Sequence, residues 1–444
     1  MHIKLPNSVE YILNILNKNG HEAFVVGGCV RDSLLNKKPN DWDITTSAEP
    51  EEVKKCFKEP IFDTGLKHGT VSLLINKEIF EITTYRMDGE YKDGRHPENV
   101  NFTKSLAKDL ERRDFTINAM AYNHIDGLID LFNGKNDLDN KIIKAVGDPI
   151  KRFNEDGLRM MRAIRFAAQL GYKLDKKTYN AIKECSNLIT KISAERIENE
   201  LSKILTSNFP EKIIDLYDLG ITNYIMPEFN SIMECEQNNK WHYANVGNHT
   251  IDALKNIKND KILRWAALLH DIGKPESKST DERGFDHFHG HPKVSVDISK
   301  NILKRLKFSN KEKERILSLV ELHDSYKVSK STVKKWIAKY GDSFVDDLIE
   351  LQKADSKAHV EAAYEIKFKL IDQLLKYKNE IIEENSAVSL KDLEINGHDL
   401  INIGYNPGKN IGIILNKILE EVISERLSNN KEELIKYVNE NFKK

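Results

Sequence analysis

The pattern of hydrophobic residues changes once along this chain, and this change limits the possible folds more than any other feature. Before Asp148-Pro149, short apolar runs are bounded by turn residues, and several alternate in polarity, which is typical of strands. From residue 153 onward, apolar residues recur at helical spacing. Only 11 prolines and 22 glycines occur in 444 residues, which favours helices over a sandwich of strands. The predicted strands are 23–26, 43–45, 71–75 and 80–85.

Charge, cysteine content and hydropathy argue against several classes of protein. The 68 Lys and Arg balance 69 Asp and Glu, so the net charge does not indicate a nucleic-acid binder, although local basic surfaces remain compatible with it. The four cysteines lack the CxxC spacing of zinc knuckles. No apolar run reaches the roughly 18 residues of a membrane span, and the N-terminus does not resemble a signal peptide. We therefore expect a cytoplasmic protein without membrane contact, and no obligate protein partner is evident.

A glycine pair followed by two aspartates forms the first candidate site. Gly27-Gly28 follows a predicted strand and opens a helix, so that its backbone N–H groups can approach a phosphate, and Arg31 adds a cation. Asp41 and Asp43 are two residues apart, which in a strand places both carboxylates on one face. An isolated pair of this kind is more often a solvated strand end. The glycine turn upstream instead favours nucleotidyl transfer with two metal ions.

Glu81, on a neighbouring predicted strand, can supply a third carboxylate, and oxygen ligands of this kind suit Mg²⁺. Residues 23–46, AFVVGGCVRDSLLNKKPNDWDITT, resemble the signature of the class II tRNA nucleotidyltransferase and bacterial poly(A) polymerase superfamily. The resemblance implies a polymerase-β-type nucleotidyltransferase head with a small mixed sheet, followed by an elongated helical neck, a further helical domain and a tail.

A second motif, residues 112–119, is also similar to that superfamily, in which it handles the triphosphate and the ribose. Arginines neutralise phosphate, while aspartate and asparagine can bond sugar hydroxyls. Without this context, such a run is more often a surface salt bridge. The nucleotide-binding candidates here are Arg112, Arg113, Asp114 and Asn118.

A third motif, at residues 152–166, contains an acid and three arginines at helical spacing. Asp156 and Arg159 would be i,i+3 neighbours, with Arg162 and Arg165 continuing the same exposed ridge. A carboxylate accepts from the exocyclic amine of C or A, while a guanidinium donates to ring nitrogen or carbonyl oxygen, so this pair can select those bases. The alternative is a salt bridge on a solvated helix. The order EDGLRMMRAIRFAAQLG resembles the base-selecting motif of the superfamily.

Three further segments resemble parts of the same enzymes. Residues 193–201 resemble a helix that supports the base-selecting one, to which we assign a structural role. Residues 88–97 resemble a loop that accompanies the switch from adding C to adding A, although such a loop is also typical of any mobile segment. Residues 396–412 resemble the end that contacts tRNA.

Histidines with metal-binding spacing form the fourth candidate site. A His-Asp pair within an apolar helix needs compensation for its burial, and the order H…HD…H…H…D resembles the HD phosphohydrolase superfamily. The resemblance implies a helical domain that holds Mn, Fe, Ni or Zn, and such a site can activate water against a phosphoester. We interpret His242, His287 and His289 as bystanders. The predicted ligands are His249, His270, Asp271 and Asp355, with His291 and His323 for a second metal.

Together these motifs predict four parts and one activity. The parts are the head at 1–140, the neck at 141–225, the HD domain at 226–375 and the tail at 376–444. The resemblance implies an enzyme that adds CCA to the 3′ end of tRNA, using CTP, ATP and Mg²⁺. The alternatives are an A-adding enzyme, a poly(A) polymerase, an HD phosphohydrolase whose head only binds nucleotides, and a non-catalytic RNA-binding protein.

Overall fold

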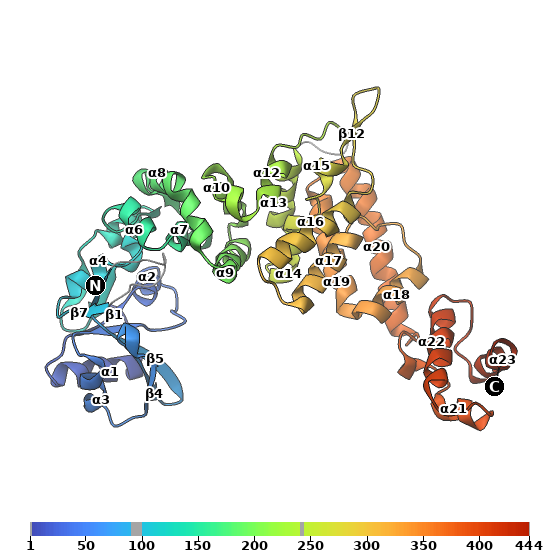
Figure 1. Cartoon of the computed structure of the whole chain (residues 1–444), viewed down its shortest axis with the longest axis horizontal. Helices are drawn as coiled ribbons and strands as arrows, with labels where there is room; N and C mark the ends of the chain where they lie inside the picture. Colours follow the sequence, from blue (N-terminus) through green and yellow to red (C-terminus); the bar gives the residue numbers. More distant parts are fainter. Residues whose placement is uncertain (1, 90–99, 240–243, 444) are drawn as a thin grey trace. The chain divides into compact units, whose positions relative to one another are not determined.

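The chain folds into two compact units, residues 1–230 and 231–444 (Figure 1). The computed structural model describes residues 2–89, 100–239 and 244–443. The predicted α+β class is confirmed, because unit 1 holds a seven-stranded sheet with helices and unit 2 is almost entirely helical. The four-part division proposed from the sequence stays a prediction.

The sheet of unit 1 places β1 and β2 among its inner strands, in the order β3-β4-β5-β2-β1-β8-β9. Neighbouring strands are antiparallel except β2 and β5, which run parallel with Ile44 beside Ile82. This pairing brings the start of β2 beside the second half of β5. The strands are β1 (Ala23–Val26), β2 (Ile44–Thr46), β3 (Ile61–Gly65), β4 (Thr70–Ile75), β5 (Glu78–Thr84), β8 (Met120–Asn123) and β9 (Gly127–Asp130).

One strand boundary differs from the prediction at a residue that matters for the site. We expected Asp43 inside a strand, but β2 begins at Ile44, so Asp41 and Asp43 lie in the segment that leads into it. The Asp43 carbonyl still accepts a hydrogen bond from the Val26 amide, at 3.0 Å. The segment is therefore held beside the end of β1, although regular pairing with β5 starts one residue later.

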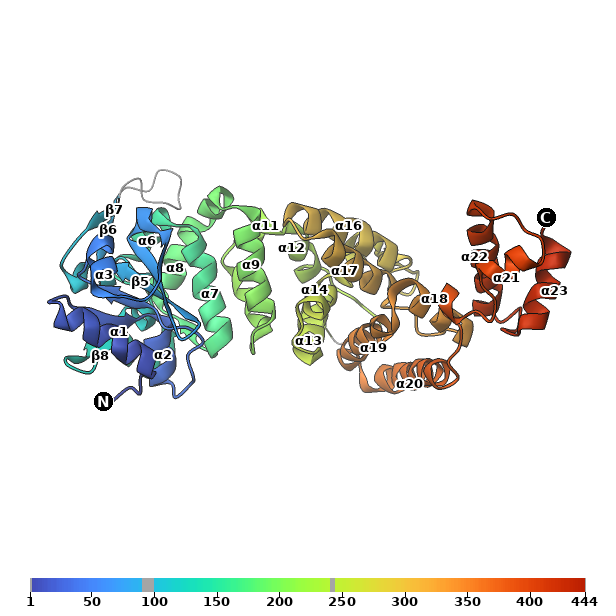
Figure 2. The ribbon, with the colours of Figure 1, turned by 90° about the horizontal axis from the view of Figure 1, so that it is seen from below.

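Helices flank the sheet and continue from it in unit 1. α1 packs on β1, and α2 begins immediately after β1. Farther along, α7 packs against α9, and the two helices lie side by side in both views (Figures 1 and 2). The helices of unit 1 include α1 (Asn7–Lys18), α2 (Gly28–Leu34), α4 (Leu106–Glu111), α6 (Pro149–Glu155), α7 (Leu158–Leu170), α8 (Lys176–Cys185), α9 (Ala194–Leu205) and α10 (Ile213–Asp218), and α12 (Pro227–Met233) crosses from unit 1 into unit 2.

The first part of unit 2 is a helical bundle in which α19 contacts α13, α14, α17, α18 and α20. α14 is apolar along most of its length and ends directly before His270-Asp271. The helices are α13 (Val246–Asn256), α14 (Lys261–Leu269), α16 (His291–Arg305), α17 (Asn310–Leu322), α18 (Lys330–Tyr340), α19 (Asp342–Lys357) and α20 (Glu361–Glu383).

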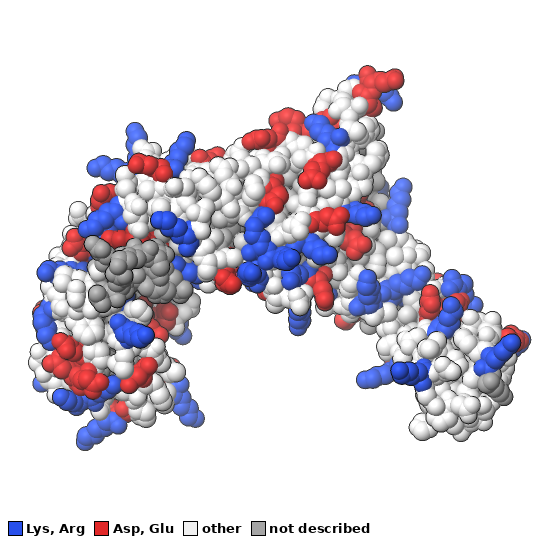
Figure 3. All heavy atoms as spheres, viewed as in Figure 1, with Lys and Arg blue, Asp and Glu red and all other residues white. Residues whose placement is uncertain are grey.

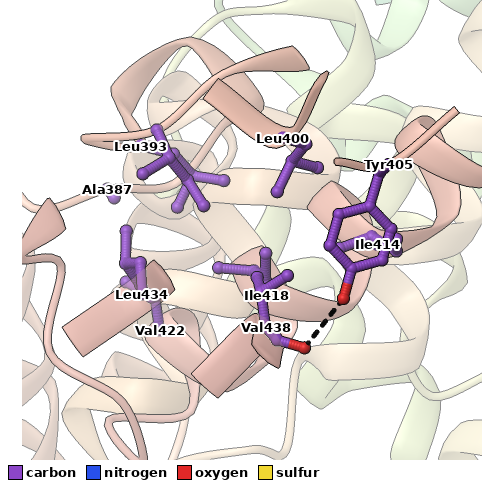
Figure 4. Packing of buried hydrophobic residues seen from close by; sticks show 10 residues of the cluster. Ala387, Leu393, Leu400, Tyr405, Ile414, Ile418, Val422, Leu434 and Val438 are labelled. Carbon is purple, nitrogen blue, oxygen red and sulfur yellow. Dashed lines mark hydrogen bonds between the residues drawn. The ribbon is translucent and has the colours of Figure 1, made fainter. Parts of the chain in front are cut away.

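The last segment of unit 2 forms a small helical module with its own core (Figure 4). Leu400, Ile418 and Val438 are fully buried, and the Tyr405 hydroxyl donates to the Val438 carbonyl at 3.2 Å. α22 ends at Ile423, and two residues later Glu425 adopts a positive φ of 59°, which a continuing right-handed helix does not allow. The helices are α21 (Gly397–Asn402), α22 (Lys409–Ile423) and α23 (Lys431–Asn441).

Candidate active site and a buried histidine cluster

The glycine pair lies where β1 meets α2, as the sequence predicted. Gly27 has a φ of +77°, and a Cβ built on it would lie 3.1 Å from Nη1 of Arg113. Glycine is favoured there for two reasons: the left-handed conformation and the closeness of the guanidinium. The chain turn therefore lies directly against one of the predicted phosphate-binding arginines.

The three predicted carboxylates gather beside this turn. Because Ile44 pairs with Ile82 in parallel register, Asp43 and Glu81 are neighbours one residue before it. Although Asp43 keeps an exposed surface, crowding by protein atoms raises the pKa of its carboxyl, as do the charges of Asp41 and Glu81, while Arg113 opposes the rise. The group therefore concentrates negative charge that an added cation would relieve.

Asp109, which sequence reasoning missed, holds the two adjacent arginines of the second motif. Its buried carboxylate lies 2.8 Å from Nη2 of Arg112 and 3.3 Å from Nη2 of Arg113. Burial acts to raise the pKa of Asp109, but the two guanidinium groups outweigh it and the pKa falls. The i,i+3 and i,i+4 spacing to the arginines is a signal that could have identified it.

Asp114 and Asn118 link the first motif to the third. Nη1 of Arg31 donates to the Asn118 side chain at 2.7 Å, and the Asn118 amide donates to Asp114 at 3.3 Å. Asp114 also accepts from Nε of Arg162 at 2.8 Å. Burial alone would raise the pKa of Asp114, but Arg162 and then Arg159 outweigh burial and lower it to about 2. Asp114 is thus a permanently charged connector.

The predicted base-selecting pair is arranged differently from the i,i+3 helix pair that we expected. α7 begins at Leu158, so Asp156 lies in the turn before it and accepts from the Leu158 amide at 3.0 Å. Its ion-pair partner is Arg196 on α9, with Nη2 2.7 Å from Oδ2. Arg159 instead donates to Glu155 at 2.7 Å and to the Arg112 carbonyl at 3.1 Å.

We predicted that Arg165 lies on an exposed ridge with Arg162, but the structure shows otherwise. It is buried, and its Nε lies 3.0 Å from Glu200 of α9. Burial lowers the pKa of Arg165 to about 10, against the raising effect of Glu200. The supporting helix α9 thus supplies two ionic partners, Arg196 and Glu200. Sequence reasoning missed both because they lie 35 or more residues from the groups that they contact. Most of the predicted loop, residues 90–97, lies outside the described residues.

All six predicted ligands of the fourth site converge in the bundle of unit 2. Among the described residues, two groups of three bring their ligand atoms within 4.8 Å of one another, and both groups are buried. The carboxylates of the head are in neither group. The two groups are His249, His270 and Asp355, and Asp271, His291 and His323.

The four histidines share one orientation. In each, Nδ1 lies 2.7–3.1 Å from a backbone carbonyl, and Nε2 faces the aspartates of the cluster, which is the orientation of a metal-binding imidazole. Among the described residues, Nε2 of His270 has no well-aligned hydrogen-bond partner, although it lies 3.2 Å from Asp271. This arrangement presents inward-facing nitrogen and carboxylate donors suited to a metal ion. The carbonyls belong to Ala358, Ala267, Phe288 and Val320.

Two lysines and a tyrosine, which we did not predict, complete the cluster. Lys274 lies 2.7 Å from Asp271, and Lys367 lies 2.9 Å from Asp355. The Tyr326 hydroxyl also donates to Asp355, at 2.7 Å. Although burial acts to raise it, the pKa of Asp355 is held well below its ordinary range by Lys367 and by a fifth histidine, His359. Despite its burial, the pKa of Asp271 is likewise well below its ordinary range, mainly because of His270 and Lys274, so both aspartates are charged.

The cluster opens into a pocket of about 670 Å³. Two of the predicted bystanders, His287 and His289, line its outer part and stack on each other with ring centroids 5.5 Å apart. They are not members of the metal-ligand groups. The third, His242, lies outside the described residues. The pocket gives a small molecule access to His291, His323 and both aspartates.

Comparisons with known proteins match this arrangement along the chain. Residues 23–144 match the family described as Poly A polymerase head domain, and residues 171–233 match the probable RNA- and SrmB-binding site of polymerase A. Residues 288–438 match a putative second domain of tRNA nucleotidyltransferases. A CCA-adding enzyme from Lactobacillus helveticus is 35% identical over 431 residues, which are 96% of this chain and 95% of that protein. The chain belongs to the CCA-adding enzyme family.

Other members of the family support this assignment. The CCA-adding enzyme of Ligilactobacillus salivarius is 35% identical over 99% of this chain and 97% of its own length. The crystal structure of the Bacillus stearothermophilus CCA-adding enzyme in complex with CTP aligns over 98% of both chains, with 27% identity and a TM-score of 0.71. Membership makes the chain a nucleotidyltransferase that depends on a divalent cation, typically Mg²⁺. Within the described residues, no helix has the length and apolar character that crossing a membrane requires.

Proposed function

We propose that this chain adds the 3′-terminal CCA to tRNA without a nucleic-acid template, using CTP and ATP and releasing pyrophosphate. One observation carries the proposal: Arg31, which follows the glycine turn, is joined through Asn118 and Asp114 to Arg162 of the helix α7 that we propose selects the base. The phosphate end and the base end of a nucleotide therefore have connected binding groups. Membership of the CCA-adding family supports the same reaction.

The three carboxylates beside the inner strands β2 and β5 fit Mg²⁺. Asp41 and Asp43, with Glu81 beside them, offer only oxygen donors, which Mg²⁺ prefers. When bound, two such ions would lower the pKa of the attacking tRNA 3′-hydroxyl and stabilise the leaving pyrophosphate. The excess of negative charge at Asp43 supports this assignment, because a cation would relieve it.

The chain's own groups would hold the triphosphate and the sugar. The Gly27 amide donates to the Met120 carbonyl at 3.3 Å, so the amides of the first turn of α2, which begins at Gly28, would bind phosphate, where a partial positive charge favours it. Arg31 and Arg113 would each add a full positive charge. Arg112 is next to Arg113 in the chain, and both form ion pairs with Asp109. Asn118 would form hydrogen bonds with the ribose. Asp114, which accepts from both Asn118 and Arg162, would hold the Asn118 side chain in position.

Asp156 and Arg159 would select the base. The carboxylate accepts from the exocyclic amine of C or A, and the guanidinium donates to the adjacent ring nitrogen or carbonyl oxygen. Uracil and guanine present the opposite arrangement of hydrogen-bond donors and acceptors, which does not match this pair. Both side chains are already held, by Arg196 and Glu155 respectively, so the reading edge is preorganised.

Transfer RNA would be recognised by shape and backbone, as structured RNA generally is. α16 carries four cations against one carboxylate, Asp297. On the face shown in Figure 3, Lys and Arg side chains gather over the part of unit 2 built by α14, α16 and α17. This concentration supports contact with phosphates although the chain is nearly neutral. The cations of α16 are Lys293, Lys300, Lys304 and Arg305.

Incorporation of labelled CTP and ATP, singly and together with Mg²⁺, tests the proposal on three tRNA transcripts. The transcripts end before CCA, after the first C and after CC. Addition of CCA followed by a stop is the expected result. A single A added only after CC would indicate an A-adding enzyme, and a long A tail a poly(A) polymerase. No incorporation would refute nucleotide addition by this chain.

The histidine cluster favours a second function, hydrolysis of phosphoesters. Its four histidines and two aspartates, all buried, offer nitrogen and oxygen donors that fit Mn, Fe, Ni or Zn, and four of the six line the pocket. Metal analysis of the purified protein and hydrolysis of bis-p-nitrophenyl phosphate test it. Asp271→Asn should remove both metal and hydrolysis, whereas Asp41→Ala should leave them intact and remove nucleotide addition. A wild-type protein that binds no transition metal would refute it.

A further inference from the structure

One aromatic ring lies against three arginines that come from two different parts of unit 1. The guanidinium carbons of Arg31, Arg162 and Arg165 lie 5.2, 5.5 and 4.1 Å from the centroid of Phe166. Arg31 belongs to α2, next to the glycine turn, whereas the other two belong to α7. Cation–π attraction acts over this range, and it is stronger where the groups are removed from water.

The ring itself is firmly placed. Phe166 is 6% exposed, and Phe115 packs edge-on against it with centroids 5.7 Å apart. Phe115 is fully buried and directly follows Asp114. The ring therefore has little freedom to turn or shift, and it can serve as a fixed reference for the groups around it.

Each arginine has a carboxylate of its own, so the ion pairs do not explain why the three gather. Arg31 pairs with Asp32, and Arg165 lies 3.0 Å from Glu200. Arg162 pairs with Asp114. Three like charges around one ring repel one another, and Phe166 is the contact that all three share. The negative face of the ring offsets part of that repulsion.

We propose that Phe166 is a positioning residue for nucleotide binding, whose ring fixes the spacing between Arg31 at the phosphate end and Arg162 at the base end. This inference rests on the phosphate-binding role proposed above for Arg31 and on the position of Arg162 in α7, which also carries Arg159 of the proposed base-selecting pair. Phe166 itself touches no reacting atom. Because the ring sets a spacing and does not read a base, its loss weakens CTP and ATP binding alike.

Fluorinated phenylalanines introduced at position 166 of the full-length chain separate ring electrostatics from ring shape. Mono-, di- and trifluorophenylalanine keep the shape while weakening the negative face. We expect KM for CTP and for ATP to rise in parallel with each fluorine, reaching about tenfold as partly desolvated cation–π contacts are lost. The value of kcat and the melting temperature should stay close to those of the wild type.

Phe166→Leu and Phe229→Leu form a matched pair of variants. Phe229 is a fully buried ring of α12 that packs edge-on against Tyr217. Both variants should lose stability to a similar degree, but only Phe166→Leu should raise KM. A KM that stays flat across the fluorine series overturns the proposal, since Phe166 would then only fill space.

Separate measurements test the role of Phe166 and the proposed function. Nucleotide addition by the wild-type protein tests the function by itself. Should the wild type add no nucleotide, calorimetric titration with CTP and Mg²⁺ across the same fluorine series measures the effect on binding directly. A dissociation constant that rises with fluorination supports the inference, and one that does not change refutes it.

Discussion

Asp114→Asn removes the charge of the connector between the first and third motifs, for which we propose nucleotide binding, without changing its shape. The wild-type carboxylate is 8% exposed and accepts from Arg162, from Asn118 and from the Phe115 amide. The amide keeps some of these contacts but loses its attraction to the guanidinium. We expect the variant to fold, with a lower free energy of unfolding.

The size of the loss follows from the pKa of Asp114. A fall from 3.8 to about 2 corresponds to roughly 2.5 kcal/mol at about 1.4 kcal/mol per pH unit. Because the pKa is depressed in the folded state, this contribution is complete above pH 3.8 and is lost as the pH falls toward 2. The guanidinium of Arg162 is 34% exposed, so solvent limits the additional cost of leaving it unpaired.

Urea unfolding at pH 7, 5 and 3 measures the effect. The difference between wild type and Asp114→Asn should be equal at pH 7 and 5 and smaller at pH 3. Asp137→Asn is the matched control, since this buried aspartate accepts from the Thr116 hydroxyl at 2.7 Å, and about 1 kcal/mol is expected there. Equal losses in the two variants, or a loss at Asp114 that does not depend on pH, would refute the reasoning.

Three further outcomes are expected. Asp43→Asn should abolish CTP addition to a tRNA that ends before CCA without lowering the melting temperature, because neighbouring carboxylates already disfavour its charge; substantial remaining addition would contradict its role. Arg196→Met should raise KM for CTP and ATP about tenfold, since charge-assisted hydrogen bonds such as that to Asp156 contribute roughly 1.5 kcal/mol. Lys203→Met on the same helix should leave KM unchanged, and equal effects of the two variants would show that Arg196 does not position Asp156 for base selection. His270→Ala should lower the transition-metal content measured by mass spectrometry while CTP addition continues at the wild-type rate, and an unchanged metal content would exclude it as a ligand.

The sequence was most informative where a local pattern carries the structure. The strand 23–26 has the predicted bounds, and α7 ends at Leu170, where Gly171 follows with a φ of 72°, a conformation that favours glycine. All six predicted histidine and aspartate ligands meet in unit 2, because they belong to a recognisable order of residues. Local pattern therefore predicted both the elements and the members of this site.

Sequence reasoning was weaker wherever a charge is paired over a long distance. We placed Asp156 on a helix with Arg159, but its carboxylate caps the turn before α7 and pairs with Arg196, forty residues later. Lys367 was missed for a related reason, because an isolated lysine is most often a solvated surface group. Burial and long-range pairing decide such cases, and periodicity does not reveal them.

The position of β1 between β2 and β8 also has a consequence for how the protein is made. During synthesis, β1 can pair with β2 soon after both leave the ribosome, but its other edge stays open until Met120–Asn123 has emerged. Asp114 and Asn118 immediately precede that strand. The polar link to Arg31 and the closing of the sheet are therefore completed in the same stretch of translation, so that a nascent head completes the site proposed for the nucleotide only as it loses its exposed edge.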